Sequence, residues 1–353
     1  MRTMKIPLLA VGVVAAAVMF SGCMKEQKPH GMPVLTVMTH DSFKISEKIV
    51  RDFEQANACK ISFLKSGDAG AALNQAILSQ KNPMADIFYG VDNTFMGRAL
   101  NAGIFEAYSS PFLKDIPDEL KLDKTDRLLP VDYGDVCLNY DKAWFTRKRL
   151  VPPSSLEDLL NRKYRDLTVV ENPATSSPGL AFLLATIGHF GENGYIDYWK
   201  KLKANGVYVA NGWEDAYWGQ FSVASKGTRP IVVSYASSPP AEVYFSKKPL
   251  KEAPTAAVVA PDTAFRQVEF IGILKGTKNI ALARKLMDYM LDIPFQEDIP
   301  LQMFVFPTNK RAALPDVFKK HARLAREPIM IDPSTIAAHR DKWIEAWTES
   351  VLR

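Results

Sequence analysis

The sequence predicts an α/β fold built from two lobes. Short apolar segments with strand character alternate with segments whose apolar residues recur at helical spacing, which indicates a mainly parallel sheet covered by helices on both faces. Roughly 330 residues would remain after removal of an N-terminal export signal, and a chain of this size usually divides into two hydrophobic cores. Hydrophobic residues make up 47% of the chain and charged residues 24%, which are values typical of a globular protein.

The N-terminus predicts export. Arg2 and Lys5 precede an uninterrupted apolar run from Ile6 to Phe20, and small residues then lead to Cys23. A basic start, an apolar middle and small residues before a cleavage site are typical of a secretory signal peptide, here residues 1–22. Because the run is shorter than the ~20 apolar residues of a membrane-spanning helix, we expect cleavage rather than a permanent anchor helix.

The residues around the cleavage site resemble a bacterial lipobox, in which small residues end in a cysteine. This resemblance implies a lipid on the sulfur of Cys23, which would become the mature N-terminus. Residues 23–32 turn polar at once and are expected to form a tether. The lipid would hold the chain at a membrane while the folded part stays in solution.

The charge balance does not favour a nucleic acid partner. Two of the 44 basic residues lie in the predicted signal, which leaves 42 against 39 acidic residues, a net charge of +3. No run of basic residues has aromatic residues between them. The five histidines are scattered, and the sequence contains neither a metal-ligand spacing nor a glycine-rich phosphate loop. We therefore expect no metal and no cofactor.

The first lobe is predicted over residues 33–132. Strands are expected at Val34–Thr39, Lys60–Leu64 and Ala85–Val91, with helices at Ile45–Ala56 and Ala69–Ser79. Ligands of such sheets lie beyond the carboxyl ends of the strands, so the polar residues there are site candidates: Asp41, Ser42, Asp68, Asp92 and Asn93. For Asp41 and Asp92, which stand between a strand and a helix, helix capping is the alternative.

The second lobe is predicted over residues 133–266. The expected elements, in order, are a helix at Leu156–Asn161, a strand at Leu167–Val170, helices from Ser177 to Phe190, at Tyr195–Asn205 and at Trp213–Ser225, and a strand at Ile231–Tyr235. Ser177 is a predicted N-cap with Pro178 at the first helical position. The N–H groups of this helix start can hold a hydroxyl or an anion, or Ser177 can simply cap the helix.

The remaining chain is divided between the lobes. A strand at Gln267–Leu274 is expected to return to the first lobe, together with helices at Ile280–Leu291 and Pro294–Leu301, so that lobe also takes about residues 267–312. The second lobe takes about residues 313–353 and is closed by a long amphipathic helix, Ser334–Arg353.

An aromatic cluster predicts the ligand class. Trp213 and Tyr217 stand at i and i+4 of a predicted helix, and Tyr235 ends a predicted strand. Acidic and hydroxyl residues surround them. Flat aromatic walls with a carboxylate suit a planar, cationic, heteroaromatic ligand, since rings stack on its faces and the negative charge meets its cation. Packing in the core is the alternative for each ring, above all for Tyr217.

Eight short blocks occur in order along residues 33–353. They are Val34–Phe43, Gly90–Asn93, Val131–Gly134, Asn139–Lys142, Pro173–Leu180, Gly212–Tyr217, Ser234–Pro239 and Phe306–Asn309. The ordered set resembles the thiamine-binding proteins among the solute-binding proteins of ABC importers. The resemblance implies a type II periplasmic-binding-protein fold, with hinge-linked lobes and thiamine in the cleft. It also implies a monomeric, non-enzymatic carrier in the periplasm that serves a permease in the cytoplasmic membrane.

The resemblance also implies site residues. The positions that match the family's ligand contacts are His40, Asp68, Trp213, Tyr235 and Phe304. His40 stands where the family usually has a tyrosine and Phe304 where it often has a tryptophan. Ser176 and Ser177 match the contacts to the hydroxyethyl or phosphate end, so thiamine phosphates are further candidate ligands. We expect Asp68 to be the counter-charge of the cation, and Tyr133 either to pack at the hinge or to contact the ligand.

Two other functions remain open from the sequence. The first is a binding protein for another cationic solute such as a polyamine; a ferric-ion site is disfavoured because no two tyrosines are adjacent. The second is a thiaminase-like enzyme, for which Cys137 and Glu171 are the candidate nucleophile and base. No basic residue adjoins Cys137 to lower its pKa. In an exported protein Cys137 could instead pair with Cys59.

Overall fold

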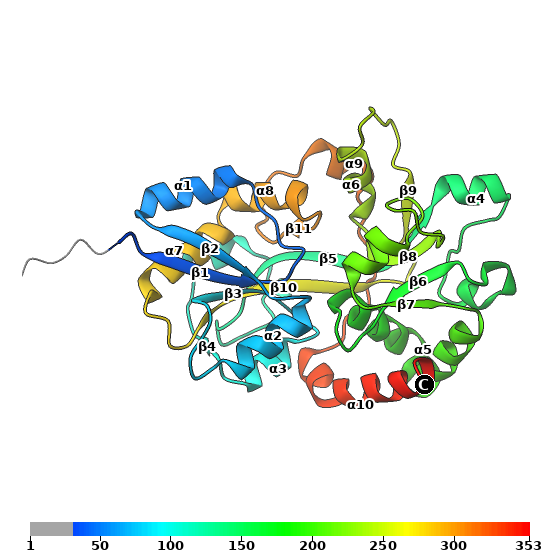
Figure 1. The fold of residues 1–353 in the computed structure, drawn as a ribbon, viewed down its shortest axis with the longest axis horizontal. Helices are drawn as coiled ribbons and strands as arrows, with labels where there is room; N and C mark the ends of the chain where they lie inside the picture. Colours follow the sequence, from blue (N-terminus) through cyan, green and yellow to red (C-terminus); the bar gives the residue numbers. More distant parts are fainter. Residues whose placement is uncertain (1–30) are drawn as a thin grey trace, which may run out of the picture.

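The computed structural model describes residues 31–353 (Figure 1). The predicted signal peptide, Cys23 and most of the predicted tether lie outside the described residues. None of the helices in the described part is long and apolar enough to cross a membrane. Cys59 and Cys137 are both buried and free, so the disulfide that the sequence permits is not formed.

The described strands form one mixed sheet with the main order β2-β1-β3-β10-β5-β8-β6-β7, to which β4, β9 and β11 add at the sides. Their bounds are β1 Val34–Thr39, β2 Lys60–Lys65, β3 Ile87–Asp92, β4 Phe105–Glu106, β5 Leu129–Asp141, β6 Thr168–Glu171, β7 Tyr208–Ala210, β8 Ile231–Tyr235, β9 Thr255–Val258, β10 Phe265–Leu274 and β11 Phe306–Pro307. All six residues of β3 are buried, as expected for a central strand covered on both faces.

Helices pack on both faces of the sheet (Figure 1). They are α1 Glu47–Asn57, α2 Ala69–Leu78, α3 Met96–Asn101, α4 Lys142–Lys148, α5 Ser177–Ala204, α6 Ser238–Tyr244, α7 Ile280–Leu291, α8 Ile293–Gln302, α9 Asp316–His321 and α10 Pro333–Val351. Trp347 of α10 meets Trp199 of α5 edge to face at 5.5 Å between centroids, and both are buried. The closing helix thus contributes to the core, and it also contacts α3.

Two long strands connect the two ends of the sheet. Strands β1, β2 and β3 are parallel neighbours at one end, and β6, β7 and β8 lie at the other (Figure 1). Strand β5 pairs with β10 through its first half and with β8 through its second half. Strands β5 and β10 therefore carry the chain between the two ends, which is the arrangement that a two-lobed protein with strand hinges requires. The predicted lobe boundaries at residues 132/133 and 266/267 stay a prediction.

The predicted strands are all present, and the helices differ in three places. The predicted helix at Trp213–Ser225 is a short π-helical segment, Asp215–Gln220, in which the Phe221 N–H donates to the Ala216 carbonyl five residues back. The predicted helix at Leu156–Asn161 is a 3₁₀ turn, Glu157–Leu160. The two helices predicted after residue 177 form one interrupted element, since Gly191 adopts φ 71°, ψ 169°, a conformation that glycine tolerates best.

Candidate functional site

A cavity of about 330 Å³ lies where the two ends of the sheet meet. We call it the central cavity. Its lining comes from the turn after β1, the starts of α2 and α5, residues 211–218, the end of β8, α6, strand β10 and residues 303–305. Of the eleven predicted ligand residues, eight line it: His40, Asp41, Asp68, Ser177, Trp213, Tyr217, Tyr235 and Phe304. Segments distant in sequence converge because parallel strands end at one edge of the sheet.

The ring of Trp213 is held in place from two sides. Tyr217 stacks on it with centroids 5.0 Å apart and planes 18° apart. The indole Nε1 donates a hydrogen bond to Ser234 Oγ at 2.9 Å. Tyr217 is itself buried, and its hydroxyl donates to Glu242 Oε1 at 2.6 Å. The sequence prediction that the two rings lie one above the other is confirmed, and Tyr217 acts both as core residue and as support for Trp213.

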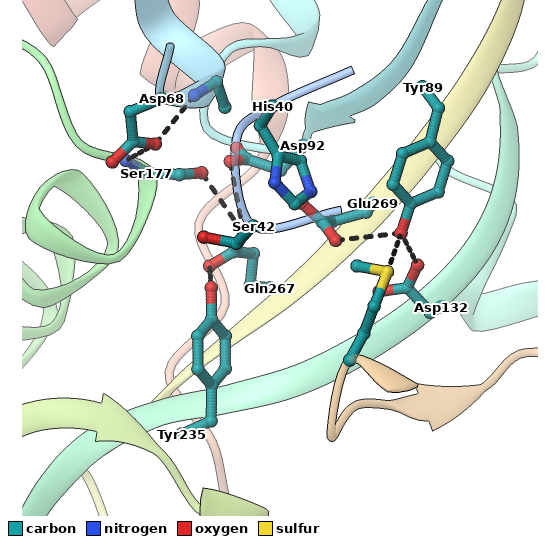
Figure 2. A network of polar contacts seen from close by, with 12 residues as sticks. His40, Ser42, Asp68, Tyr89, Asp92, Asp132, Ser177, Tyr235, Gln267 and Glu269 are labelled. Atoms are coloured by element: carbon teal, nitrogen blue, oxygen red, sulfur yellow. Dashed lines mark hydrogen bonds and ion pairs between the residues drawn. The ribbon is translucent and has the colours of Figure 1, made fainter. Parts of the chain in front are cut away.

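Tyr235 is fixed through a buried amide. Its hydroxyl donates to Gln267 Oε1 at 3.2 Å, and Gln267 Nε2 donates to Ser177 Oγ at 3.2 Å and to Asp92 Oδ2 at 3.3 Å (Figure 2). Burial, followed by the charge of Glu269, raises the pKa of Tyr235 well above its ordinary value, so the phenol stays neutral. The amide therefore connects β8, β10, β3 and the start of α5 in one network.

Phe304 reaches the cavity from a strained backbone. Its φ of 57° lies in the left-handed region, which a phenylalanine seldom adopts. The Ser237 hydroxyl donates to the Phe304 carbonyl, and the ring packs on Phe245 and Phe318 with centroids 5.3 and 6.2 Å away. Strain of this kind persists where the surroundings fix the conformation, and it is frequent at ligand sites.

The carboxylate of Asp68 stands between two helix starts. It is the N-cap of α2, where Oδ1 accepts from the Ala69 N–H at 2.7 Å, and it also lies 3.5 Å from the Ser177 backbone nitrogen of α5 (Figure 2). Burial raises the pKa of Asp68, against the lowering effect of these N–H groups. Asp41 makes a similar contact, because its Oδ1 accepts from the Gly67 N–H at 2.9 Å.

His40 and Glu269 form an ion pair at the cavity wall, with 3.5 Å between Nε2 and Oε1. Burial alone would lower the pKa of His40, but the charge and hydrogen bond of Glu269 outweigh it, and the pKa is raised. Burial alone would raise the pKa of Glu269, but the charge of His40 outweighs burial, and the pKa of Glu269 is lowered. Behind the pair, the Tyr89 hydroxyl donates to Asp132 and Glu269 (Figure 2). Burial and the Glu269 charge raise the pKa of Asp132 well above its usual range.

Glu269 was not predicted from the sequence. The available signal was a single acidic residue inside the apolar strand Phe265–Leu274. A charged side chain in a buried strand requires a partner, and the partner here is His40.

Three predicted ligand residues lie outside the cavity lining. Ser176, not Ser177, is the N-cap of α5, and its buried hydroxyl lacks a hydrogen-bond partner within the described structure. Asp92 is fully buried and accepts from the Thr94 N–H at 2.6 Å, and burial raises its pKa to about 7. Tyr133 stacks on Phe306 at 5.6 Å between centroids and lies under Arg266, which supports the packing alternative.

The two residues of the enzyme alternative also lie elsewhere. Neither Cys137 nor Glu171 lines the central cavity, and both are buried. Burial raises the pKa of the Cys137 thiol, which disfavours the nucleophilic thiolate. Burial likewise raises the pKa of Glu171 well above its usual range. Across residues 31–353, no group of three or more His, Cys, Asp and Glu side chains is arranged to hold a metal ion.

Comparison with known proteins identifies the family. The profile described as "Bacterial extracellular solute-binding protein" matches residues 82–325. The chain belongs to this family. The solute-binding protein is 31% identical to the thiamine-binding periplasmic protein of Salmonella typhimurium over 91% of this chain and 94% of that protein. It is 30% identical to the one of Brucella suis, over 90% and 92%.

A solved periplasmic thiamin-binding protein superimposes on the solute-binding protein with a TM-score of 0.81 at 29% identity, covering 92% of this chain and 98% of that one. The resemblance inferred from the ordered blocks is confirmed, and so is the type II periplasmic-binding-protein fold. The family assignment makes this chain an extracytoplasmic solute-binding protein rather than a member of an enzyme family.

Proposed function

We propose that the solute-binding protein captures thiamine in the central cavity and delivers it to an ABC permease in the cytoplasmic membrane. The observation that carries the proposal is one cavity that joins the rings of Trp213, Tyr235 and His40 to the carboxylates of Asp68 and Glu269. Thiamine joins a planar aminopyrimidine to a permanently charged thiazolium, so rings can stack on its faces while carboxylates meet its charge. The names of the relatives support the same ligand.

Capture would proceed by closure of the lobes. Residues on the two sides of the cavity already meet, since Ser42 Oγ donates to Glu214 Oε1 at 3.2 Å. Closure around thiamine would cover both ring faces, and opening at the permease would release the unreacted vitamin.

We further propose that the carrier is monomeric and is tethered by a lipid on Cys23. A Cys23→Ser variant should then leave the detergent phase for the aqueous phase, whereas continued partition into detergent would contradict the tether.

Calorimetric titration tests the ligand. Purified protein should bind thiamine in a single saturable step and should bind spermidine much more weakly. Tight spermidine binding without thiamine binding would replace the proposal with the polyamine alternative. Mass spectrometry of the bound ligand after prolonged incubation should recover intact thiamine; free pyrimidine product would indicate an enzyme instead.

A further inference from the structure

His40 and a cationic ligand compete for one carboxylate in the central cavity. Among the described residues that line the cavity, His40 is the only one whose side chain can carry a positive charge. Its Nε2 lies 3.5 Å from Oε1 of Glu269, which lines the same cavity. An ordinary N–H···O hydrogen bond measures about 2.7–3.2 Å, so the imidazole does not hold Glu269 tightly. A ligand cation that approaches Glu269 would therefore take over the role of the imidazolium.

The imidazole of His40 has little room to withdraw from such a ligand. One edge of the ring lies against the backbone of Gly90, where an added Cβ would come within 2.5 Å of His40 Cδ2. The ring of Tyr89 lies 5.7 Å away between centroids, and the ring of Phe43 lies 6.5 Å away, edge-on. Because His40 is confined in this way, we expect it to respond to a nearby positive charge by losing its proton rather than by turning aside.

The charged neighbours of His40 come from several elements. Burial lowers the pKa of His40, but Glu269 of β10 outweighs burial and raises it. Asp68 at the start of α2 raises this pKa further, and Lys65 at the end of β2 opposes the increase. Tyr89 of β3 stays neutral, because burial raises the pKa of its phenol well above the ordinary value. On balance the pKa of His40 is raised, so His40 titrates near neutral pH.

Two buried acids stand behind the pair of His40 and Glu269. Asp132 of β5 and Asp92 of β3 each lie opposite Glu269 in the strand register. Burial raises the pKa of Asp132 well above its usual range and that of Asp92 to about 7. A ligand cation would favour the ionised form of these acids too, which also releases protons. Neither acid lines the cavity, so we expect His40 to contribute most of the released protons.

We infer that the binding of a cationic ligand in the central cavity expels the proton of His40, so that the affinity for thiamine rises with pH. The thiazolium keeps its charge at every pH, and like charges held close together disfavour one another. Bound thiamine should therefore lower the pKa of His40, and by linkage the loss of that proton strengthens binding. The affinity is lowest below the pKa of His40 in the complex, rises between the two values, and is constant above its pKa in the free protein. This inference rests on the proposed function and adds a proton to it.

Calorimetric titration with thiamine in buffers of different ionisation enthalpy tests the inference, because it counts the protons released per bound ligand. In the natural protein we expect proton release at pH 6 to 7. A lowering of the His40 pKa by one unit would make the affinity at pH 8 up to about tenfold higher than at pH 6. In His40→Gln both the proton release and the affinity ratio should fall, since glutamine does not titrate and can still donate to Glu269. The control is His189→Gln, which removes a histidine paired with Glu157 outside the cavity lining and should change neither quantity.

The outcomes separate this inference from the proposed function. Thiamine binding without proton release in the natural protein would overturn the inference and leave the proposed function intact, whatever the variants do. Proton release that persists at the natural level in His40→Gln would assign it to the buried acids and overturn the role of His40. His40→Asn is a second variant, and melting temperatures check the folding of both. Failure of the natural protein to bind thiamine would instead overturn the proposed function.

Discussion

One wall of the central cavity carries charge, whereas another carries aromatic rings. The charged wall consists of His40, Asp68 and Glu269, which come from the turn after β1, the start of α2 and strand β10. The aromatic wall consists of Trp213 and Tyr235, which come from residues 211–218 and the end of β8. In the charged wall each group is held by hydrogen bonds or an ion pair, whereas in the aromatic wall Trp213 combines stacking on Tyr217 with one hydrogen bond to Ser234. We therefore expect the rings to stack on a planar ligand and the fixed carboxylates to favour a cationic one.

The largest expected effect comes from the aromatic wall. Trp213→Ala should weaken thiamine binding by about 1–3 kcal/mol, because the loss of the indole removes both apolar contact and ring stacking. Titration calorimetry at neutral pH measures this change. Trp144→Ala is the matched control, since Trp144 packs on Phe145 outside the cavity lining and its loss should leave the affinity unchanged. An unaltered affinity in Trp213→Ala would mean that this wall does not touch the ligand.

The aromatic wall was largely predictable from the sequence, and so were two residues of the charged wall, His40 and Asp68; Glu269 was not. Trp213 and Tyr235 stand at element ends, where local periodicity and strand position suffice to find them. Glu269 is brought to the site by the pairing of β10 with its neighbouring strands, in which Glu269 stands opposite Asp132 on β5 and opposite Asp92 on β3. Such register between segments more than a hundred residues apart leaves no trace in local sequence patterns, so the buried acid network could not be foreseen.

Two smaller differences from the prediction have separate origins. The N-cap of α5 was predicted at Ser177, one residue too late. Ser176 and Ser177 are both good N-cap residues, and only the backbone conformation shows which of them takes this position. For Tyr133 the sequence left both hinge packing and ligand contact open. Its stacking on Phe306 depends on the pairing of β11 with β5, which the sequence does not show. Long, strongly apolar strands such as β3 and β10 were found correctly because burial on both faces dictates their composition.

An intermediate effect is expected in the charged wall, as a change in the pH dependence of stability. The folded-state pKa of His40 is raised above 6.5, so its stabilising contribution is complete below about pH 6.5 and is lost as the pH rises through the raised value. Glu269, with a lowered pKa, contributes above about pH 4.5 and is lost on further acidification. In Glu269→Gln the decline in melting temperature between pH 6 and 8 should therefore be shallower than in the natural protein.

Thermal melts across this pH range measure the effect. Glu157→Gln is the control, because it removes the acid of another histidine–glutamate pair, His189 with Glu157, whose acid is exposed and lies away from the cavity. Its profile should parallel that of the natural protein. Parallel profiles for Glu269→Gln as well would show that the His40 pair does not govern the pH dependence.

The smallest effect separates the two tasks of Tyr235. Tyr235→Phe keeps the ring of the aromatic wall but removes the hydroxyl that donates to Gln267 Oε1. One buried acceptor would lose its partner, which should lower the free energy of unfolding by about 1 kcal/mol. For a chain of this length that corresponds to a fall of roughly 1–3 °C in melting temperature. Thiamine affinity should change less than in Trp213→Ala, since stacking needs only the ring. A loss of affinity as large as in Trp213→Ala would show that the hydroxyl network, and not ring stacking, holds the ligand on this wall.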